Sequence, residues 1–194
     1  MTRGAARGWA AAGGETVRIG VLENPLDFLA EDHVREREVC ALIDKLAAGS
    51  PVNDSERHML LAFLNEQLPQ HLADEDIDLF PLMLQRCAPD EEIDKVIHEL
   101  LAGHGTTRLD APAIAGLIEA GERELPAFSK KMRTRMTGFA HQARQDLIVE
   151  NAIILPLARA HLTKNDLAKM KTHMLERRSS DVPPLCVYVP RQQP

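Results

Sequence analysis

Apolar residues recur at three- and four-residue intervals along most of the chain, which is the spacing of amphipathic α-helices. Four segments with this pattern are long, and a fifth is short. They run from near Pro25 to Gly49, from Asn53-Asp54-Ser55 to about Cys87, from Asp90 to about Gly121, from near Pro126 to about Leu162, and from Lys164 to about Arg178. Long helices joined by short connections predict an all-α fold, an up-and-down four-helix bundle with a short extra C-terminal helix.

Prolines and glycines interrupt two of the predicted helices. Pro69 and Pro81 lie inside the second segment, where each removes a backbone donor and favours a kink or a broken turn. The third segment contains Gly103, Gly105 and Pro112, which weaken its helical pattern more than that of the other long segments.

The length of 194 residues and the hydrophobic content of 44% are enough for one domain with a real core. We assign residues 21–179 to this domain. Residues 1–20 are read as a flexible extension, because they lack the continuous apolar stretch of a secretory signal. Residues 180–194 form a Pro-rich tail for which we predict no regular structure.

Charge and cysteine content narrow the classes of partner. A net charge of −6 argues against nucleic acid as the main partner, and the chain has no apolar run long enough for a transmembrane helix. The three cysteines, Cys40, Cys87 and Cys186, are widely spaced and form no CxxC pair, which favours a reducing, cytoplasmic environment without a disulfide framework. For Cys87 in particular, the sequence offers no partner at a metal-binding spacing.

His71 and Glu75 are the first candidates for chemistry. They are four residues apart, so on a helix they project from one face, and the apolar residues Leu64, Leu68 and Leu82 continue that face. A buried, ionised carboxylate without a partner costs several kcal/mol or more, so a cation is expected beside it. A pair with this spacing is more often a surface pair or a satisfied core histidine, so the rest of the chain decides the matter.

The fourth segment repeats the arrangement of the second. His71 and Glu75 precede Pro81 by ten and six residues, and Asp146 and Glu150 precede Pro156 by the same intervals. Each of the other two long segments places one histidine on its apolar face. The predicted metal ligands are therefore His33, His71, Glu75, His104, Asp146 and Glu150. Mixed imidazole and carboxylate ligands suit iron or manganese better than zinc, and six ligands in a helix bundle suggest a dinuclear centre.

This pattern resembles the hemerythrin-like family, the HHE cation-binding domains. It has a lone histidine in helix one (His33), HxxxE in helix two, a lone histidine in helix three (His104) and a related pair in helix four, over roughly residues 25–162. The most specific part is His71/Glu75 followed by Leu79-Phe80-Pro81. The resemblance implies bridging roles for Glu75 and Glu150 and terminal roles for the three histidines. It also implies two iron ions, bridged by oxo or hydroxo and carboxylate groups; manganese or zinc could replace them.

Asp146 departs from the family pattern, which has histidine at this position. His141 is no substitute, because it is nine residues from Glu150 and points about 180° away on a helix. Asp146 can bind through oxygen, and a harder, more negative ligand set favours ferric iron. We therefore hypothesise that the site favours oxidation over reversible oxygen carriage. The alternative is the loss of one ion, which would leave a mononuclear or weakly occupied site.

Three further groups of charged residues lie on or near the predicted helices. Glu36 could be an extra ligand, an acceptor for an imidazole N–H, or a charge at the rim. The acidic run from Asp74 to Asp78 reads mostly as a polar helix face that overlaps the site. Arg177 and Arg178 read as exposed charges that complement the dipole at the end of the last helix.

The leading functional prediction is a cytoplasmic, non-haem di-iron protein that binds or reduces O₂, NO or peroxide in a sensing or protective role. In this prediction the protein has no nucleic-acid or membrane partner, and it can form a homodimer. The alternative is a metal-handling protein: an iron store, or a donor for repair of iron–sulfur centres. The absence of cysteine from the first twenty residues argues against a repair role. A third interpretation is a structural bundle in which the polar core is a relic.

Overall fold

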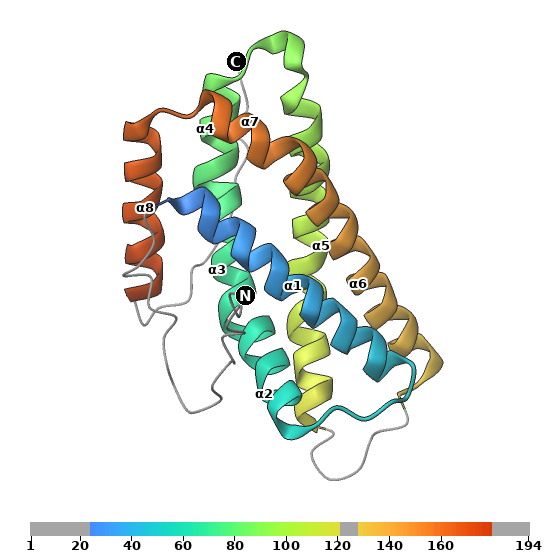
Figure 1. Ribbon diagram of the computed structural model, residues 1–194. Coiled ribbons are helices and arrows are strands. Elements are labelled where there is room, and N and C mark those ends of the chain that lie inside the picture. Colours follow the sequence, from blue (N-terminus) through green and yellow to red (C-terminus); the bar gives the residue numbers. More distant parts are fainter. Residues whose placement is uncertain (1–23, 121–127, 180–194) are drawn as a thin grey trace, which may run out of the picture.

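The computed structural model describes residues 24–120 and 128–179. Within these ranges the chain forms helices and no strand, which confirms the all-α class (Figure 1). The expectations for residues 1–20, residues 180–194 and Cys186 lie outside the described residues. No helix in the described ranges combines the length and apolar character needed to cross a membrane.

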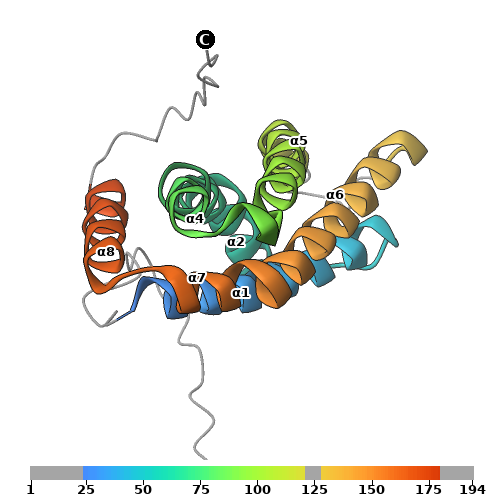
Figure 2. The same ribbon diagram turned by 90° about the horizontal axis from the view of Figure 1, so that it is seen from above.

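The helices follow the predicted segments closely. In chain order they are α1 (Pro25–Ala47), α2 (Asp54–Ala62), α3 (Leu68–Ala73), α4 (Phe80–Arg86), a 3₁₀ turn (Pro89–Glu91), α5 (Ile93–Ala120), α6 (Lys130–Val149), α7 (Leu155–His161) and α8 (Lys164–Ser179). α8 packs on the outside of the bundle, beside α1 and the α3–α4 segment (Figures 1 and 2).

Side-chain caps explain where the long helices begin. The side chain of Asn24 accepts a hydrogen bond from the Leu26 N–H at the start of α1, and Ser129 accepts one from Met132 at the start of α6. Asn53 and Glu56 form a reciprocal capping box at the start of α2. After the C-terminus of α1, Gly49 has φ +82°, a left-handed conformation that favours glycine, and it ends the helix.

π-helical turns connect α2 to α3, α3 to α4, and α6 to α7. They span Phe63–Gln67, Asp74–Leu79 and Glu150–Ile154, and each is followed at its second residue by a proline: Pro69, Pro81 and Pro156. A wider turn accommodates a residue that lacks an N–H donor and whose ring would press on the preceding turn. The predicted broken turns near Pro69 and Pro81 are thus confirmed as π turns, whereas α5 runs through Pro112 without interruption.

The apolar core is divided into two clusters. One contains residues from Val39 to Ala47 of α1, Leu60 to Leu72, Ala111 to Ile118, and Met136 to Ala143. The other contains Leu26 to Leu29, Leu79 to Met83, Ile93 to Leu100, Ile154 to Leu162, and Met170 and Met174 of α8. On the four long helical segments, the predicted ligands lie in the interval between the two clusters, except His71, which directly precedes Leu72 at the edge of the first cluster. A buried polar layer therefore crosses the middle of the bundle.

Candidate metal centre

In the polar layer, His33 and His71 direct their Nε2 atoms at the carboxylate of Glu75. His33 Nε2 lies 3.4 Å from Glu75 Oε1, and His71 Nε2 lies 3.4 Å from Glu75 Oε2. His33 Nε2 is also 3.4 Å from Glu150 Oε2. The four side chains are buried, and one ligand atom from each lies within 4.8 Å of the others. Two imidazoles and two carboxylates from three helical segments thus surround one small volume.

His104 approaches the same two carboxylates from α5. Its Nε2 lies 3.2 Å from Glu150 Oε1 and 3.7 Å from Glu75 Oε2. The ring stacks on Phe80, with centroids 5.7 Å apart and planes at 24°. Glu75 and Glu150 each have one oxygen toward His33 and the other toward His104, so both carboxylates lie between these two imidazoles.

The structure places Glu36 and Asp146 differently. Glu36 Oε2 lies 3.8 Å from His71 Nε2, so this buried carboxylate faces the His33 and His71 side of the centre. Asp146 is buried but, among the described side chains, it contacts Gln142 and Gly103 rather than an imidazole. Its Oδ1 accepts a hydrogen bond of 2.9 Å from Gln142 Nε2. A Cβ added to Gly103 would lie 2.6 Å from Asp146 Oδ2, so the missing side chain makes room for the carboxylate.

The outer nitrogen of each imidazole faces a polar group. His104 Nδ1 is 2.7 Å from Asp76 Oδ1, and Arg108 holds the other oxygen of Asp76. The amide of Asn151 lies 2.9 Å from His33 Nδ1. His71 Nδ1 faces Asp32 at 3.6 Å, too far for a hydrogen bond. At His104 the acceptor Asp76 keeps the proton on Nδ1 and leaves Nε2 free to bind a cation, whereas the Asn151 amide nitrogen is a donor to His33 Nδ1.

Electrostatics favour a cation in this layer. Burial, and then repulsion by Glu150 and Glu75, raises the pKa of Glu36 to about 7, although His71 opposes the shift. Burial also raises the pKa of Asp146 to about 6. Burial alone would raise the pKa of Glu75, but attraction by the surrounding imidazoles outweighs it and lowers that pKa. The layer therefore concentrates carboxylates, and the described groups that face Glu36, Glu75 and Glu150 with positive charge are histidines.

The donor set fits a metal centre. Glu75 Oε2 is fully buried and has no hydrogen-bond partner among the described residues, although it points among the inward-facing imidazole nitrogens. An unpaired buried carboxylate oxygen is costly, and a metal ion at this place would supply the missing contact. Glu36, Glu75, Asp146 and Glu150 together offer buried carboxylate oxygens to a cation. His141 is exposed and plays no part, as its position on the helix predicts.

The acidic run Asp74–Asp78 is not a polar face, and this expectation was wrong. Its four acidic residues are buried, and the apolar Ile77 is 51% exposed. The helical segment is surrounded by three neighbours, so consecutive acids face different helices: Glu75 faces the centre and Asp76 faces α5. Asp74 and Asp78 face α8.

α8 is attached to the metal layer through buried ion pairs, so the expectation of exposed arginines was also wrong. Arg177 donates to Asp74 at 2.9 Å and also to Asp78, and Arg178 donates to Asp74 at 3.1 Å. Asp78 additionally accepts from His173 at 2.6 Å. The guanidinium of Arg178 lies 4.7 Å from the ring centroid of Phe28, on α1.

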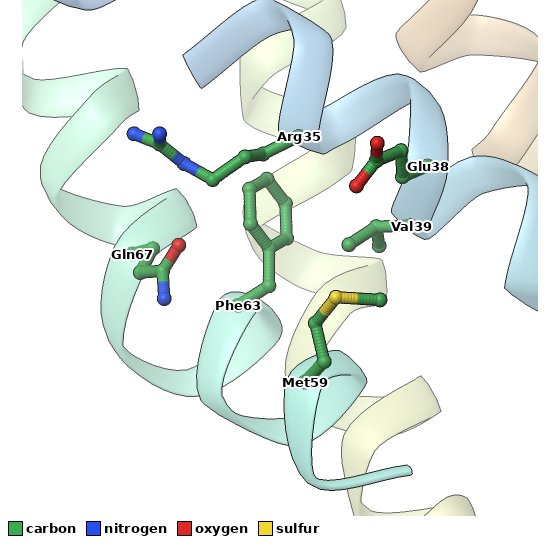
Figure 3. A pocket seen from close by; sticks show the side chains of 6 residues that line it. All are labelled: Arg35, Glu38, Val39, Met59, Phe63 and Gln67. Carbon is green, nitrogen blue, oxygen red and sulfur yellow. The ribbon is translucent and has the colours of Figure 1, made fainter. Parts of the chain in front are cut away.

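A pocket opens beside the centre, between α1 and the segment that contains α2 and the first π turn. Its lining consists of Arg35, Glu38, Val39, Met59, Phe63 and Gln67 (Figure 3). Gln67 is one helical turn before His71, and Arg35 adjoins Glu36. None of the predicted ligands lines the pocket, so it lies next to the metal layer rather than within it.

Sequence patterns did not single out the groups that support the ligands. Asp32, Asp76, Asn151 and Gly103 are each directly next to a predicted ligand in the sequence. Only Asp76 could have been found from the sequence. It directly follows Glu75 on the same helical segment, so it points in another direction, and in an enclosed segment that direction leads to a neighbouring helix. Asn151 and Gly103 matter only through contacts with distant segments.

Comparison with known proteins agrees with this geometry. No curated protein shows significant similarity to the chain. The family model described as the hemerythrin HHE cation binding domain matches residues 24–158, which include all six predicted ligands and end within α7. The chain therefore belongs to the hemerythrin HHE cation-binding domain family.

Proposed function

We propose that the protein holds two iron ions and binds or reduces O₂ or a related small molecule, NO or peroxide, in a sensing or protective role. The ligands in this proposal are those predicted from the sequence, His33, His71, Glu75, His104, Asp146 and Glu150. We also propose that the four long helical segments form an up-and-down bundle, with α8 as the extra helix.

One observation carries the proposal: three buried imidazoles aim Nε2 at two carboxylates, and one oxygen, Glu75 Oε2, has no hydrogen-bond partner. A structural polar layer would pair that oxygen with a donor. In our assignment His33, His71 and Glu36 serve one ion, and His104 and Asp146 serve the other. Glu75 and Glu150 would be shared by both ions.

Bound iron would supply the electrons and the open coordination position at which a small oxidant reacts. The chain's contribution is to hold the ligands and set their charge. Asp76 and Asn151 orient two imidazoles, and the apolar clusters on both sides exclude bulk water. Asp146 adds an anionic oxygen where the family pattern has a neutral imidazole, which stabilises the ferric state. We therefore propose oxidation chemistry rather than reversible oxygen carriage.

The placement of Asp146 favours a second candidate function, iron storage or donation. Asp146 is held by Gln142 over Gly103, so the His104 side has one imidazole contact with the two shared carboxylates. The His33 side has two imidazoles and Glu36. An ion with fewer donors leaves more easily, and an exchangeable second iron suits a carrier better than a redox centre.

Metal content and absorption test the proposal. Protein purified without added metal should contain about two irons per chain, the number that two bridging carboxylates imply, with a ferric charge-transfer band in the near-ultraviolet after exposure to air. Zinc, or iron near zero, would overturn the di-iron assignment. One tightly held iron and one that a weak chelator removes would favour donation.

The choice between oxidation and reversible carriage depends on Asp146. The reduced wild type should consume O₂ without releasing it when the gas is removed, whereas Asp146→His should release part of it. Reversible release by the wild type would overturn the oxidation assignment and leave the metal assignment intact.

A further inference from the structure

A second group of metal-binding side chains lies at the end of the bundle where α4 and α7 finish. Cys87, Glu91 and His161 each offer one ligand atom, and these atoms lie within 4.8 Å of one another. Cys87 follows α4, Glu91 ends the 3₁₀ turn and His161 ends α7, and both views place α4 beside α7 (Figures 1 and 2). The expectation that Cys87 lacks a metal-spaced partner was therefore wrong.

This group is separate from the HHE centre. Cys87 is twelve residues after Glu75, which corresponds to about 18 Å along a helix axis. The second apolar cluster, which contains Phe80, Met83 and Ala158, lies between the two groups, and Cys87 packs against it. The side chains of Cys87, Glu91 and His161 are partly exposed, so an ion from solvent can reach them.

Local contacts orient two of the three side chains. Glu91 Oε2 accepts the backbone N–H of Ala88 at 2.6 Å, which leaves Oε1 to face His161 Nε2 at 2.9 Å. The nearby guanidinium of Arg86 is engaged by Asp166 at 2.9 Å and does not neutralise Glu91. Both long helical segments also end here, and their terminal carbonyl groups favour a positive charge.

Cys87 is unlike a reactive cysteine. Burial and the charge of Glu91 raise the pKa of its thiol, so a thiolate does not form there without a cation. A divalent ion of borderline softness changes this balance, because it binds the thiolate directly and the thiol proton leaves to solvent.

We propose that Cys87, Glu91 and His161 form a zinc-binding site, with one sulfur, one nitrogen and one oxygen ligand and a water molecule in the fourth position. In a tetrahedral zinc site, ligand atoms are about 3.3–3.8 Å apart. The ligand atoms now lie within 4.8 Å of one another, and zinc binding would widen the 2.9 Å contact between Glu91 Oε1 and His161 Nε2, so small side-chain rotations are enough. The sulfur donor distinguishes this site from the HHE centre, whose ligands are all nitrogen and oxygen and suit iron.

Cobalt(II) is the probe for this site, because a cysteine thiolate bound to cobalt gives a charge-transfer band in the near-ultraviolet and histidine or carboxylate ligands do not. Titration of the full chain, isolated with its native iron, should produce this band, and zinc should abolish it by competition. Cys87→Ser should remove the band. His161→Asn should weaken cobalt binding by about tenfold or more, whereas His98→Asn, an exposed histidine of α5, should change nothing.

Protection from alkylation tests the wild type without any substitution. Zinc should slow iodoacetamide labelling of Cys87 by about tenfold or more, with no change at Cys186 when the peptides are quantified separately. A cobalt band that persists in Cys87→Ser, or labelling of Cys87 that zinc leaves unchanged, would overturn the proposal. The iron content of Cys87→Ser should equal that of the wild type, so failure here is distinct from failure of the di-iron assignment.

Discussion

Nδ1 of His104 lies 2.7 Å from Oδ1 of Asp76, so the residue directly after Glu75 supports the imidazole that α5 contributes. One helical turn thus supplies both a carboxylate of the proposed metal centre and the group that orients a proposed ligand on another helix. Removing this support should weaken the binding of the ion on the His104 side. Asp76→Ala should lower iron affinity there by about 10–100-fold, and Asp76→Asn, which keeps an acceptor, by less.

Equilibrium dialysis against a competing chelator measures this effect. The same substitution at Asp94, which is exposed near the start of α5, should leave both irons in place. If Asp76→Ala binds two irons as tightly as the wild type, then Asp76 does not position His104 for metal binding.

Gly103 leaves room for Asp146, and filling that space should displace the carboxylate. In Gly103→Ala the new Cβ would lie 2.6 Å from Asp146 Oδ2 and 3.1 Å from Gln142 Nε2. We expect the iron content to fall from about two toward about one per chain, because the His104 side has few other donors. Metal analysis of the purified variant measures the change.

Gly105 provides the matched control two residues later. Nothing lies within 4 Å of a Cβ added there, so Gly105→Ala should gain helix propensity without contact. The free energy of unfolding should rise by about 0.5–1 kcal/mol, and the iron content should not change. Equal iron content in the two alanine variants would show that Asp146 holds no metal.

Asp74 joins α8 to the metal layer, and its loss should unfold the protein more readily. The carboxylate is fully buried and accepts from Arg177 and Arg178, which are themselves largely buried. Asp74→Asn leaves Arg178 with only Asp32, at 3.9 Å, and Arg177 with only Asp78 as counter-charges, and such a loss from a buried ion-pair network costs up to about 3–5 kcal/mol. Asp110→Asn breaks the exposed pair with Arg135 and should cost less than about 1 kcal/mol.

Urea unfolding of the two variants gives the comparison. We expect the denaturation midpoint of Asp74→Asn to fall well below that of Asp110→Asn. Similar midpoints would mean that α8 contributes little through these ion pairs.

The sequence predicts the all-α class and the helix boundaries because the determining signals are local. Asn53 with Glu56, and Pro25 after Asn24, act within one turn of the residues they cap. The repeated spacing before Pro81 and Pro156 also has a local cause, since each proline follows a π turn that begins at or beside one of the two central glutamates, Glu75 and Glu150. Periodicity therefore identifies the inward residues as well as the helices.

What the sequence does not predict is how charges pair between distant segments. Asp74 and Arg178 are 104 residues apart, and Cys87 and His161 are 74 apart, so no helical period relates them. An acidic run looks like a solvent-facing surface unless the segment is known to be enclosed. Ile77 is exposed while the acids around it are buried. The enclosure of this segment by α1, α5 and α8 therefore decides which of its residues are buried, more than their polarity does.

Glu36 gives a prediction that depends on pH. In the metal-free protein, burial and the neighbouring carboxylates raise its pKa from 4.5 to about 7. Between these values the unfolded chain loses the proton while the folded chain keeps it, so stability falls as the pH rises through this range. Above pH 7 the full penalty is present, about 3 kcal/mol at ~1.4 kcal/mol per pKa unit.

Glu36→Gln removes this penalty. Relative to the wild type, metal-free Glu36→Gln should therefore be more stable at pH 8 than at pH 4.5 by about 2–3 kcal/mol, measured by urea unfolding in the presence of a chelator. Loading with iron should reverse the order at pH 8, because the cation stabilises the ionised Glu36 3.8 Å from His71 and glutamine binds it weakly. A stability difference that is the same at both pH values, or unaffected by iron, would show that Glu36 neither ionises in this layer nor contributes to the metal centre.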